Sequence, residues 1–324
     1  MVTSNSTSSE SQMTTGTFLL VGGAGFIGQA LAKALCAAGW RVIIYDHSMP
    51  KLLYSLKAEF IEAGLPIVDS IIRTGLPMPN LAIHLASTMI PGSPIANLGN
   101  DIVNNLVPFV NIVNELSEAG VVRHVFFSSG GSVYGRNGEQ VCIENSRNAP
   151  INPYGWMKLA QENFLRMITE IGNISSFIVR PSNVYGPGQN LSRPQGIIGV
   201  LLKEILVNHR IQIWGDGRIV RDYCYIDDLV GAIVALIKAS AWGDTYNVGS
   251  GVGTSVDEII EIFRKVTEID FCIEYLPARK IDIERNVLAI DKVRSLTGWE
   301  PLTKLEAGIK NTWTWIRDTI GDAL

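Results

Sequence analysis

Residues 18–28 read Phe18-Leu19-Leu20-Val21-Gly22-Gly23-Ala24-Gly25-Phe26-Ile27-Gly28, and this stretch decides the fold. Its four apolar residues predict a short buried strand, and the alanine- and leucine-rich segment Gln29 to Ala38 predicts a helix. Gly22, Gly25 and Gly28 recur at three-residue spacing, and the turn also contains the pattern G-x-G-x-x-G. Such glycines allow a tight turn, close approach of the backbone to a pyrophosphate, and packing of helix on strand. The start of the helix offers N–H groups to the same anion.

A second strand follows this helix and ends on an acid. Gly39 ends the helix, Arg41 to Tyr45 is rich in β-branched residues, and Asp46 comes next. An acid about twenty residues after the glycines can accept both ribose hydroxyls of a dinucleotide. The alternative is a glycine turn with no ligand. The order of strand, glycine turn, helix, strand and acid favours the dinucleotide.

Composition limits the class of protein. The chain has 324 residues, enough for about two domains, with 47% hydrophobic and 18% charged residues. A net charge of -4 offers no basic surface, so we predict no nucleic-acid partner. Apolar runs end well short of ~20 residues, so we predict no membrane span. Met1 to Gly16 is Ser/Thr-rich without the features of a signal peptide, and we expect a disordered leader.

The potential metal ligands are scattered. Neither the cysteines nor the histidines show the spacing of metal ligands, so we predict no catalytic metal. We also expect reduced, mostly buried cysteines in a cytoplasmic protein. The residues concerned are Cys36, Cys142, Cys224, Cys272, His47, His84, His124 and His209.

Strand and helix patterns alternate through the first half of the chain. A weak helical pattern runs from Leu53 to Ile61, and Leu65 to Ile72 is a third apolar run, which we count as the third strand. Leu81 to Ser87 predicts a fourth strand, Asp101 to Glu118 a helix, and Val122 to Phe127 a further strand. This alternation is typical of a parallel sheet with right-handed crossovers, in which ligands bind at the carboxyl ends of the strands.

A tyrosine and a lysine stand four residues apart in the next helix. Pro153 and Tyr154 begin a helix that extends to about Glu170, and Lys158 lies on the same helical face as Tyr154. An unperturbed tyrosine, with a pKa of about 10, is a poor base at neutral pH. A nearby ammonium and an oxidised nicotinamide would both lower that pKa. The alternative is an amphipathic helix in which the pair is a coincidence.

The second half of the chain changes its period. It contains Phe177 to Val179, Ile211 to Trp214 and Thr245 to Val248 as strands, and Ile197 to Val207, the helix before Lys238, Ser255 to Thr267 and a segment around Trp313 as helices. Ser255 and Glu258 form a predicted capping box.

With these motifs in place, the chain resembles the extended short-chain dehydrogenase/reductase family, and within it the nucleotide-sugar epimerases. The resemblance covers about Thr17 to Trp315. It is carried by the glycine turn, His84-Leu85-Ala86, Ser128-Ser129…Val133-Tyr134-Gly135, Tyr154…Lys158, Arg180…Asn183…Tyr185-Gly186-Pro187, Gly215-Asp216-Gly217, Arg221-Asp222-Tyr223, Asp227-Asp228, Asn247-Val248-Gly249 and Gly298-Trp299-Glu300-Pro301.

The resemblance implies a role for individual residues. Tyr154 is then the base and acid at the sugar C4 hydroxyl, Lys158 lowers its pKa and binds the nicotinamide ribose, and Asp46 selects NAD over NADP. The NAD site would comprise Gly22, Gly25, Phe26, Ile27, Gly28, Asp46, Leu85, Ala86, Ser87, Asn105, Ser128, Tyr154 and Lys158. A nucleotide sugar, expected to be UDP-linked, would be bound by Ser132, Asn183, Arg221, Arg279, Asp282 and Asn286.

The resemblance also implies the architecture. We expect an α/β fold with a Rossmann-type doubly wound parallel sheet, formed by residues 17–179 and about 219–250. A smaller C-terminal α/β domain for the substrate would comprise residues 180–218 and 251–324. Related epimerases pair through two helices each, which here are those around Asp101–Glu118 and Met157–Glu170, so we expect a homodimer.

One position departs from the family. The family's catalytic Ser/Thr lies four residues before the Tyr of Val-Tyr-Gly, where this chain has Gly130. Ser129 or Ser132 must replace it, and we favour Ser132 slightly. A second feature concerns substrate size. Asn286 stands where a bulky Tyr would exclude N-acetyl sugars, so we expect a pocket that admits them, unless Asn286 is a loop residue facing solvent.

Four functions fit these residues. The first is NAD-dependent C4 epimerisation of a nucleotide sugar through a 4-keto intermediate. The second is 4,6-dehydration, although the dehydratases carry Asp-Glu where this chain has Gly131-Ser132. The third is a nucleotide-sugar 4-reductase or dehydrogenase that exchanges its cofactor. The fourth is a non-catalytic NAD-binding relative. The Tyr154/Lys158 pair favours the first.

Overall fold

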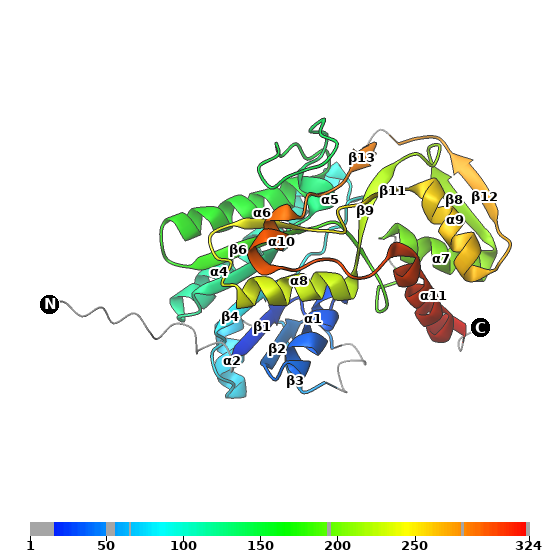
Figure 1. Cartoon of the computed structure of the whole chain (residues 1–324). Helices are drawn as coiled ribbons and strands as arrows, with labels where there is room; N and C mark the ends of the chain where they lie inside the picture. The colour runs from blue at the N-terminus through cyan, green and yellow to red at the C-terminus, as the bar shows by residue number, and fades with distance from the viewer. Residues whose placement is uncertain (1–15, 50–55, 65, 193–195, 280–281, 322–324) are drawn as a thin grey trace.

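The computed structural model describes residues 16–49, 56–64, 66–192, 196–279 and 282–321 (Figure 1). All of the expected leader except Gly16 lies outside these residues. Among the helices described, none is long and apolar enough to cross a membrane. The four cysteines are free thiols, of which Cys142 and Cys224 are buried and Cys272 is exposed.

A seven-stranded parallel sheet forms the centre of the first lobe. Its strands, in chain order, are β1 (Thr17–Val21), β2 (Arg41–Asp46), β3 (Ala58–Glu62), β4 (Leu81–His84), β5 (Arg123–Phe127), β6 (Ser175–Pro181) and β10 (Thr245–Val248). They lie in the order β10-β6-β5-β4-β1-β2-β3, and every neighbouring pair is parallel. The chain reverses direction across the sheet between β1 and β4, so the predicted doubly wound sheet is confirmed. Ligands of such sheets bind beyond the carboxyl ends of the strands at this point.

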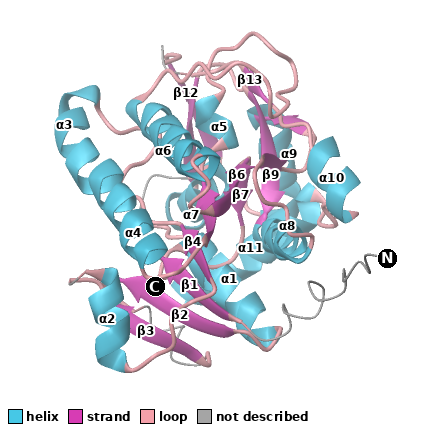
Figure 2. Cartoon of the chain, turned by 90° about the vertical axis from the view of Figure 1, so that its left-hand side faces the viewer, coloured by secondary structure: helices cyan, strands magenta, loops and turns pink. Residues whose placement is uncertain are grey.

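Helices cover both faces of the sheet (Figure 2). On one face, Leu20 of β1 packs in a core with Leu31 and Ile233, and on the other Leu19 packs with Ile71 and Leu116. Both faces of β1 are thus buried, which explains why its sequence is a continuous apolar run. The helices are α1 (Phe26–Ala37) and α8 (Ile226–Lys238) on the first face, and α2 (Ile67–Thr74), α4 (Val107–Glu118) and α6 (Pro153–Glu170) on the second. Before α4 come η2 (Ile95–Asn97), α3 (Leu98–Asp101) and the π-helix η3 (Ile102–Leu106).

Two predictions between β2 and β4 are wrong. Phe60 and Ile61, assigned to a helix, belong to the edge strand β3, where Ile44 pairs with Phe60 and Tyr45 with Ile61. The apolar run counted as the third strand is the helix α2, whose Ile67 and Ile71 are buried one turn apart while Ile72 is exposed. Leu53, at the start of the expected helix, lies outside the described residues.

The second lobe is built around its own core, on the right of Figure 1. Leu202, Ile259, Phe263 and Ile309 are all buried in this core. Its elements are α7 (Ile197–Asn208), β8 (Arg210–Trp214), α9 (Val256–Thr267), β12 (Cys272–Leu276) and α11 (Leu305–Gly321), with β8 and β12 paired in parallel. The capping box at Ser255 and Glu258 is confirmed at the start of α9.

Strand β9 joins the two lobes. It pairs with β7, β11 and β13 in a small sheet. These strands are β7 (Asn183–Tyr185), β9 (Val220–Tyr225), β11 (Gly253–Ser255) and β13 (Arg285–Asn286). The chain then enters α10 (Asp291–Thr297), whose Val293 packs in the core beneath the seven-stranded sheet. The division of the chain into domains at residues 180, 219 and 251 stays a proposal.

Two buried histidines, one on β4 and one on β5, stack against each other. Nε2 of His84 lies 2.9 Å from Nδ1 of His124, whose Nε2 lies 2.8 Å from the carbonyl oxygen of Val121. The rings are stacked with centroids 5.2 Å apart. Burial lowers the pKa of His124 to about 4, and burial with the neighbouring His124 lowers that of His84 well below its ordinary value. Both rings are therefore neutral at pH 7.

This pair makes the fold sensitive to acid. The folded-state pKa values lie below the unfolded value of about 6.5, so the unfolded chain binds more protons and stability is lost as pH falls from about 6.5 toward 4. His124 alone accounts for roughly 3 kcal/mol over that window. We predict that His124→Gln flattens the fall in unfolding free energy between pH 6.5 and 5, measured by urea titration. The matched control is His47→Gln at an exposed histidine, and parallel curves for all three proteins would contradict the prediction.

Candidate active site

The glycine turn between β1 and α1 leaves no room for side chains at two of its glycines. A Cβ on Gly22, where φ is +80°, would lie 2.6 Å from the backbone of Ala86. A Cβ on Gly28 would lie 2.5 Å from the carbonyl oxygen of Gly23. Gly25 is the N-cap of α1, whose first turn carries no acid, and no described side chain caps it. The N–H groups in the first turn of α1 are therefore available to a pyrophosphate.

Asp46 lies where its spacing predicts, at the end of β2 beside the glycine turn. One carboxylate oxygen accepts the N–H of Ala24 at 2.9 Å and the other accepts the N–H of His47 at 2.7 Å. A carboxylate has about four acceptor positions, so capacity remains for ribose hydroxyls. Phe26 and Ile27 begin α1 next to this acid and are half-buried.

The loop after β4 forms the wall opposite the glycine turn. The N–H of Leu85 donates to the carbonyl of Val21, and Ala86 lies against Gly22. Asn105, buried in the π-helix η3, accepts the N–H of Thr88 at 2.9 Å. Asn105 thus holds the loop after β4 in place through Thr88. Ser87 accepts the N–H of Met89. The structure brings these predicted cofactor residues to one edge of the sheet.

The short helix α5 (Gly130–Val133) follows β5 directly. Ser128 is buried, and its N–H donates to the carbonyl of Val179 on β6 at 2.8 Å. A Cβ on Gly130 would lie 2.5 Å from Cδ1 of Leu288. A serine at position 130 would therefore have to displace Leu288, which explains the departure from the family pattern.

Tyr154 and Lys158 face the same side of α6. The helix begins after Asn152, whose side chain accepts the N–H of Gly155 at 2.8 Å. Nζ of Lys158 lies 5.8 Å from the centre of the Tyr154 ring and donates to the carbonyl of Phe127 at 2.9 Å. These contacts place the pair at the carboxyl end of β5.

Burial decides the protonation of this pair. It raises the pKa of Tyr154 to about 12, and a hydrogen bond with Ser129 opposes that rise only in part. It lowers the pKa of Lys158 to about 8, and Glu162 opposes that fall. We expected Lys158 to lower the pKa of Tyr154 toward neutral pH. The side chains of the protein alone do not do so, because the desolvation of the phenolate has the larger effect on this pKa. The contact with Tyr154 favours Ser129 over Ser132 as the hydroxyl partner.

Two arginines meet where a diphosphate is expected. Arg279 donates twice to Asp282, at 2.9 and 3.2 Å, and lies over the Trp214 ring. Burial lowers the pKa of Arg221, Asp282 opposes this fall, and Arg279 adds to it, so the two guanidinium groups lie within electrostatic reach. Bidentate cations of this kind suit a diphosphate.

Asn183 and Asn286 border α5 from the second lobe. Asn183 donates to the carbonyl of Asp222 at 2.9 Å, and its Oδ1 lies 3.8 Å from the Cβ position of Gly131. Asn286 is 1% exposed and donates to the carbonyl of Gly130 at 3.1 Å. The alternative of a solvent-facing loop residue is wrong. Because Asn286 is packed this closely, Asn286→Tyr would disturb α5 as well as the pocket.

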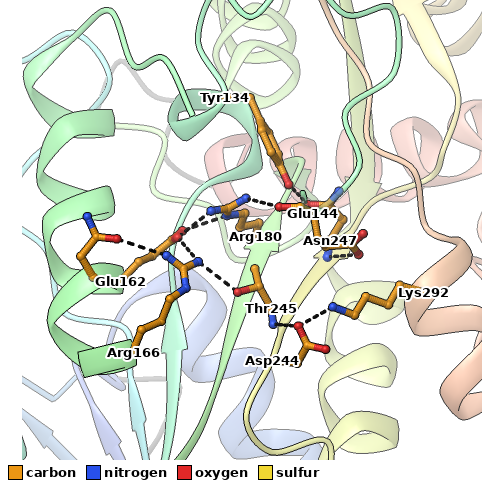
Figure 3. Close-up of polar contacts among 10 residues, drawn as sticks. Tyr134, Glu144, Glu162, Arg166, Arg180, Asp244, Thr245, Asn247 and Lys292 are labelled. Carbon is orange, nitrogen blue, oxygen red and sulfur yellow. Dashed lines mark hydrogen bonds and ion pairs between the residues drawn. The ribbon is translucent and has the colours of Figure 1, made fainter. Parts of the chain in front are cut away.

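Sequence reasoning missed two groups that hold the site together. Asp222, fully buried, accepts the N–H and Oγ–H of Ser250 and the N–H groups of Gly251 and Leu288. The ion pair between Glu162 and Arg180 is also buried (Figure 3). The even spacing of Tyr154, Lys158 and Glu162 was a signal for the latter. No sequence signal linked Asp222 to its partners.

A cavity of about 350 Å³ opens on the outer side of the Glu162–Arg180 pair. It is lined mainly by polar residues, among them Glu144, Arg166 and Asp244. It does not include Tyr154 or Lys158 and is not the catalytic site. Within the described ranges, no group of three or more His, Cys, Asp or Glu side chains could hold a metal ion.

The family model described as "NAD dependent epimerase/dehydratase family" matches residues 18–249 of the chain. The chain belongs to this family. The glycine turn, the start of α1 without a side-chain cap, and Asp46 fit the adenosine half of NAD. The predicted cofactor is therefore confirmed as that of the family.

Named relatives agree with this assignment. The chain is 32% identical over 310 residues to the UDP-glucose 4-epimerase of Mycolicibacterium smegmatis, covering 93% of this chain and 98% of the relative. It is 30% identical over 299 residues to a dTDP-4-dehydro-6-deoxyglucose reductase of Escherichia coli, covering 90% and 94%. The UDP-glucose 4-epimerase of Thermotoga maritima, solved with UDP-glucose, superposes with a TM-score of 0.86 at 29% identity, covering 94% and 99%.

The close approach of Gly22 to Ala86 gives a test of the glycine turn as the NAD-binding site. We predict that Gly22→Ala abolishes measurable NAD binding and destabilises the fold by roughly 1–3 kcal/mol, because the new Cβ meets backbone at a positive φ. Isothermal titration and thermal unfolding measure the two effects. Gly99→Ala, where a Cβ meets nothing within 4 Å, is the control and should match the wild type. Retained NAD affinity in the Gly22 variant would refute the assignment.

Proposed function

We propose that this protein is an NAD-dependent 4-epimerase of nucleotide sugars, acting on a UDP-hexose. The observation that carries the proposal is the grouping of Tyr154, Ser129 and Lys158 at the carboxyl end of β5, the edge of the sheet at which the glycine turn follows β1. Arg221 and Arg279, within electrostatic reach of each other, add two cations for a diphosphate. The similarity to two UDP-glucose 4-epimerases supports the substrate.

The residues divide the chemistry among them. Tyr154 takes the proton of the C4 hydroxyl and returns it, with Ser129 orienting the phenol. Since burial alone keeps the phenol protonated, this role requires the positive charge of an oxidised nicotinamide in addition to that of Lys158. Lys158, fixed by the carbonyl of Phe127, supplies positive charge beside the ring. Bound NAD supplies the hydride acceptor and donor for a transient 4-keto sugar. Arg221 and Arg279 hold the diphosphate, so that the sugar can turn while the nucleotide stays bound.

A nucleotide-sugar reductase is the second candidate. The similarity to the Escherichia coli reductase supports it, since the two chains match over nearly their full lengths. A reductase exchanges its cofactor, whereas an epimerase regenerates NAD in place. A 4,6-dehydratase is disfavoured because α5, with the sequence Gly130-Gly131-Ser132-Val133, carries no carboxylate for the loss of water.

The direct test is an NMR assay of purified protein without added cofactor. We expect C4 inversion of UDP-glucose and, if Asn286 leaves room beside C2, of UDP-N-acetylglucosamine as well. Turnover that requires added reduced cofactor would favour the reductase. Absence of both activities across UDP-, GDP- and dTDP-hexoses would reject the proposal.

Variants of the hydroxyl groups test the assignment of roles. Tyr154→Phe should keep the fold and bound NAD but lose about 10²–10⁴-fold in turnover, the usual contribution of acid–base catalysis. Ser129→Ala should lose about tenfold, since a hydrogen bond to a charged group contributes about 1.5 kcal/mol. Ser132→Ala, in the same turn, is the matched comparison and should lose less. The reverse order of the two serine variants would reassign the partner of Tyr154.

The proposal includes a homodimer in the cytoplasm. The free thiols support a reducing compartment. Helices η3, α4 and α6 expose Val103, Val107, Trp156 and Met167, each more than 40% exposed. Val103 and Val107 are one turn apart and share a face. These apolar side chains form a surface that a second copy would cover.

Light scattering tests the assembly. We predict a dimer mass at micromolar concentration and a monomer mass for Val107→Glu combined with Met167→Glu, because two buried carboxylates would oppose the interface. Leu302→Glu, at an apolar residue 87% exposed elsewhere, is the control and should stay dimeric. A wild-type monomer would end the proposal of a dimer.

A further inference from the structure

A row of four side chains follows the inner face of α6. Tyr154, Lys158, Glu162 and Arg166 are spaced by four residues and therefore lie one above another. The first two form the proposed catalytic pair. The second two have no part in the chemistry described above, although Glu162 is completely buried (Figure 3).

Glu162 is held by two arginines. Arg180 donates to both of its oxygens, from Nε at 2.9 Å and Nη2 at 2.7 Å, and Arg166 donates from Nη2 at 2.7 Å. Burial raises the pKa of Glu162, but the hydrogen bonds and charge of Arg180, with help from Arg166, bring it below its ordinary value. The carboxylate is therefore anionic throughout the neutral range, at a fixed place.

Arg180 cannot move to follow another partner. Its guanidinium lies 4.8 Å from the centre of the Tyr134 ring and donates to the carbonyl of Glu144 at 3.2 Å. Tyr134 donates to Asn247 at 2.6 Å, which ties the group to β10. These contacts fix the guanidinium that binds Glu162.

Lys158 needs a nearby anion more than an exposed lysine does. It is 3% exposed, and among the described residues it has one acceptor, the carbonyl of Phe127, and the ring of Phe126 at 4.9 Å. Tyr154 and Glu162 lie one turn away on either side of Lys158 along its own helix, and the carboxylate of Glu162 is paired with Arg180 of β6. Glu162 is the one anion among them.

We propose that Glu162 is a positioning residue for the reaction, whose fixed carboxylate keeps the Lys158 ammonium charged beside Tyr154. The reaction itself rests on the proposed function, but the charge of Lys158 is a property of this chain and can be measured without turnover. Arg166 moderates the effect, because its own positive charge neutralises part of Glu162 from the solvent side.

The experiment follows the titration of Lys158 by NMR. The full chain is labelled with ¹³C-lysine, and all variants are compared at the same NAD content. The Lys158 signal is identified by its loss in Lys158→Met. We expect a wild-type midpoint near 8. Glu162→Gln should lower it by about one unit, since removal of a neighbouring opposite charge disfavours the ammonium.

Two further variants separate charge from structure. Glu162→Asp keeps the charge and should restore most of the wild-type midpoint. Glu274→Gln removes the same group from the exposed Arg210–Glu274 pair of the second lobe and should leave the midpoint unchanged. An unchanged midpoint in Glu162→Gln, with only a loss of stability, would overturn the proposal.

Arg166→Gln provides a test with the opposite sign. Arg166 is 38% exposed, so its replacement is compatible with the fold even if Glu162→Gln fails to fold. The variant removes a positive charge and strengthens the field of Glu162, so the midpoint should rise. A midpoint that stays or falls would overturn the proposal. In an active enzyme, the alkaline limb of kcat/KM should move with each midpoint, and an inactive wild type would count against the proposed function alone.

Discussion

The buried ion pair between Glu162 and Arg180 joins α6, the helix of the proposed catalytic pair, to strand β6. Both side chains are at most 1% exposed, and two hydrogen bonds of 2.7 and 2.9 Å join them. Breaking such a pair leaves an uncompensated buried charge, which costs about 3–5 kcal/mol. Since α6 carries Tyr154 and Lys158, its distance from β5 and β6 sets the distance of the pair from the ends of those strands. The position of Tyr154 and Lys158 therefore depends on an ion pair in which neither of them takes part.

Asp222 is a second buried residue that holds separate segments together, on the side of the proposed substrate site. Its carboxylate is buried and accepts hydrogen bonds from Ser250, Gly251 and Leu288, while its carbonyl accepts from Asn183. The loop after β10, the segment after β13 and the strand β7 all meet at this residue. Burial raises its pKa, and the four hydrogen bonds oppose that rise. Arg221, which would hold a diphosphate, thus lies on a sheet fixed to the NAD-binding lobe, and Arg279 lies in the segment between β12 and β13.

Local patterns predicted the parts of the fold in which the chain interacts with itself over short distances. The strand, glycine turn and helix at residues 17–37 follow the predicted order, and α6 begins at Pro153 and ends at Glu170 as expected. The pattern failed between β2 and β4. Strand β3 lies at the edge of the sheet and is mostly half-buried, so its burial lacks a clear period, and α2 has only two turns. The eight residues of α2, with four apolar side chains, fit a strand or a helix equally well.

Contacts between distant residues lay beyond such patterns, and Gly130 shows why. In sequence it is a missing serine, which weakens the catalytic assignment. In the structure its Cβ position is filled by Leu288, a residue 158 positions later, and its carbonyl accepts a hydrogen bond from Asn286. The space that the expected hydroxyl would occupy is filled by packing between α5 and the second lobe. The hydroxyl beside Tyr154 comes instead from the preceding residue, Ser129. The packing of Gly130 against Leu288 and its hydrogen bond with Asn286 therefore couple the turn that carries Ser129 directly to β13 and the segment after it.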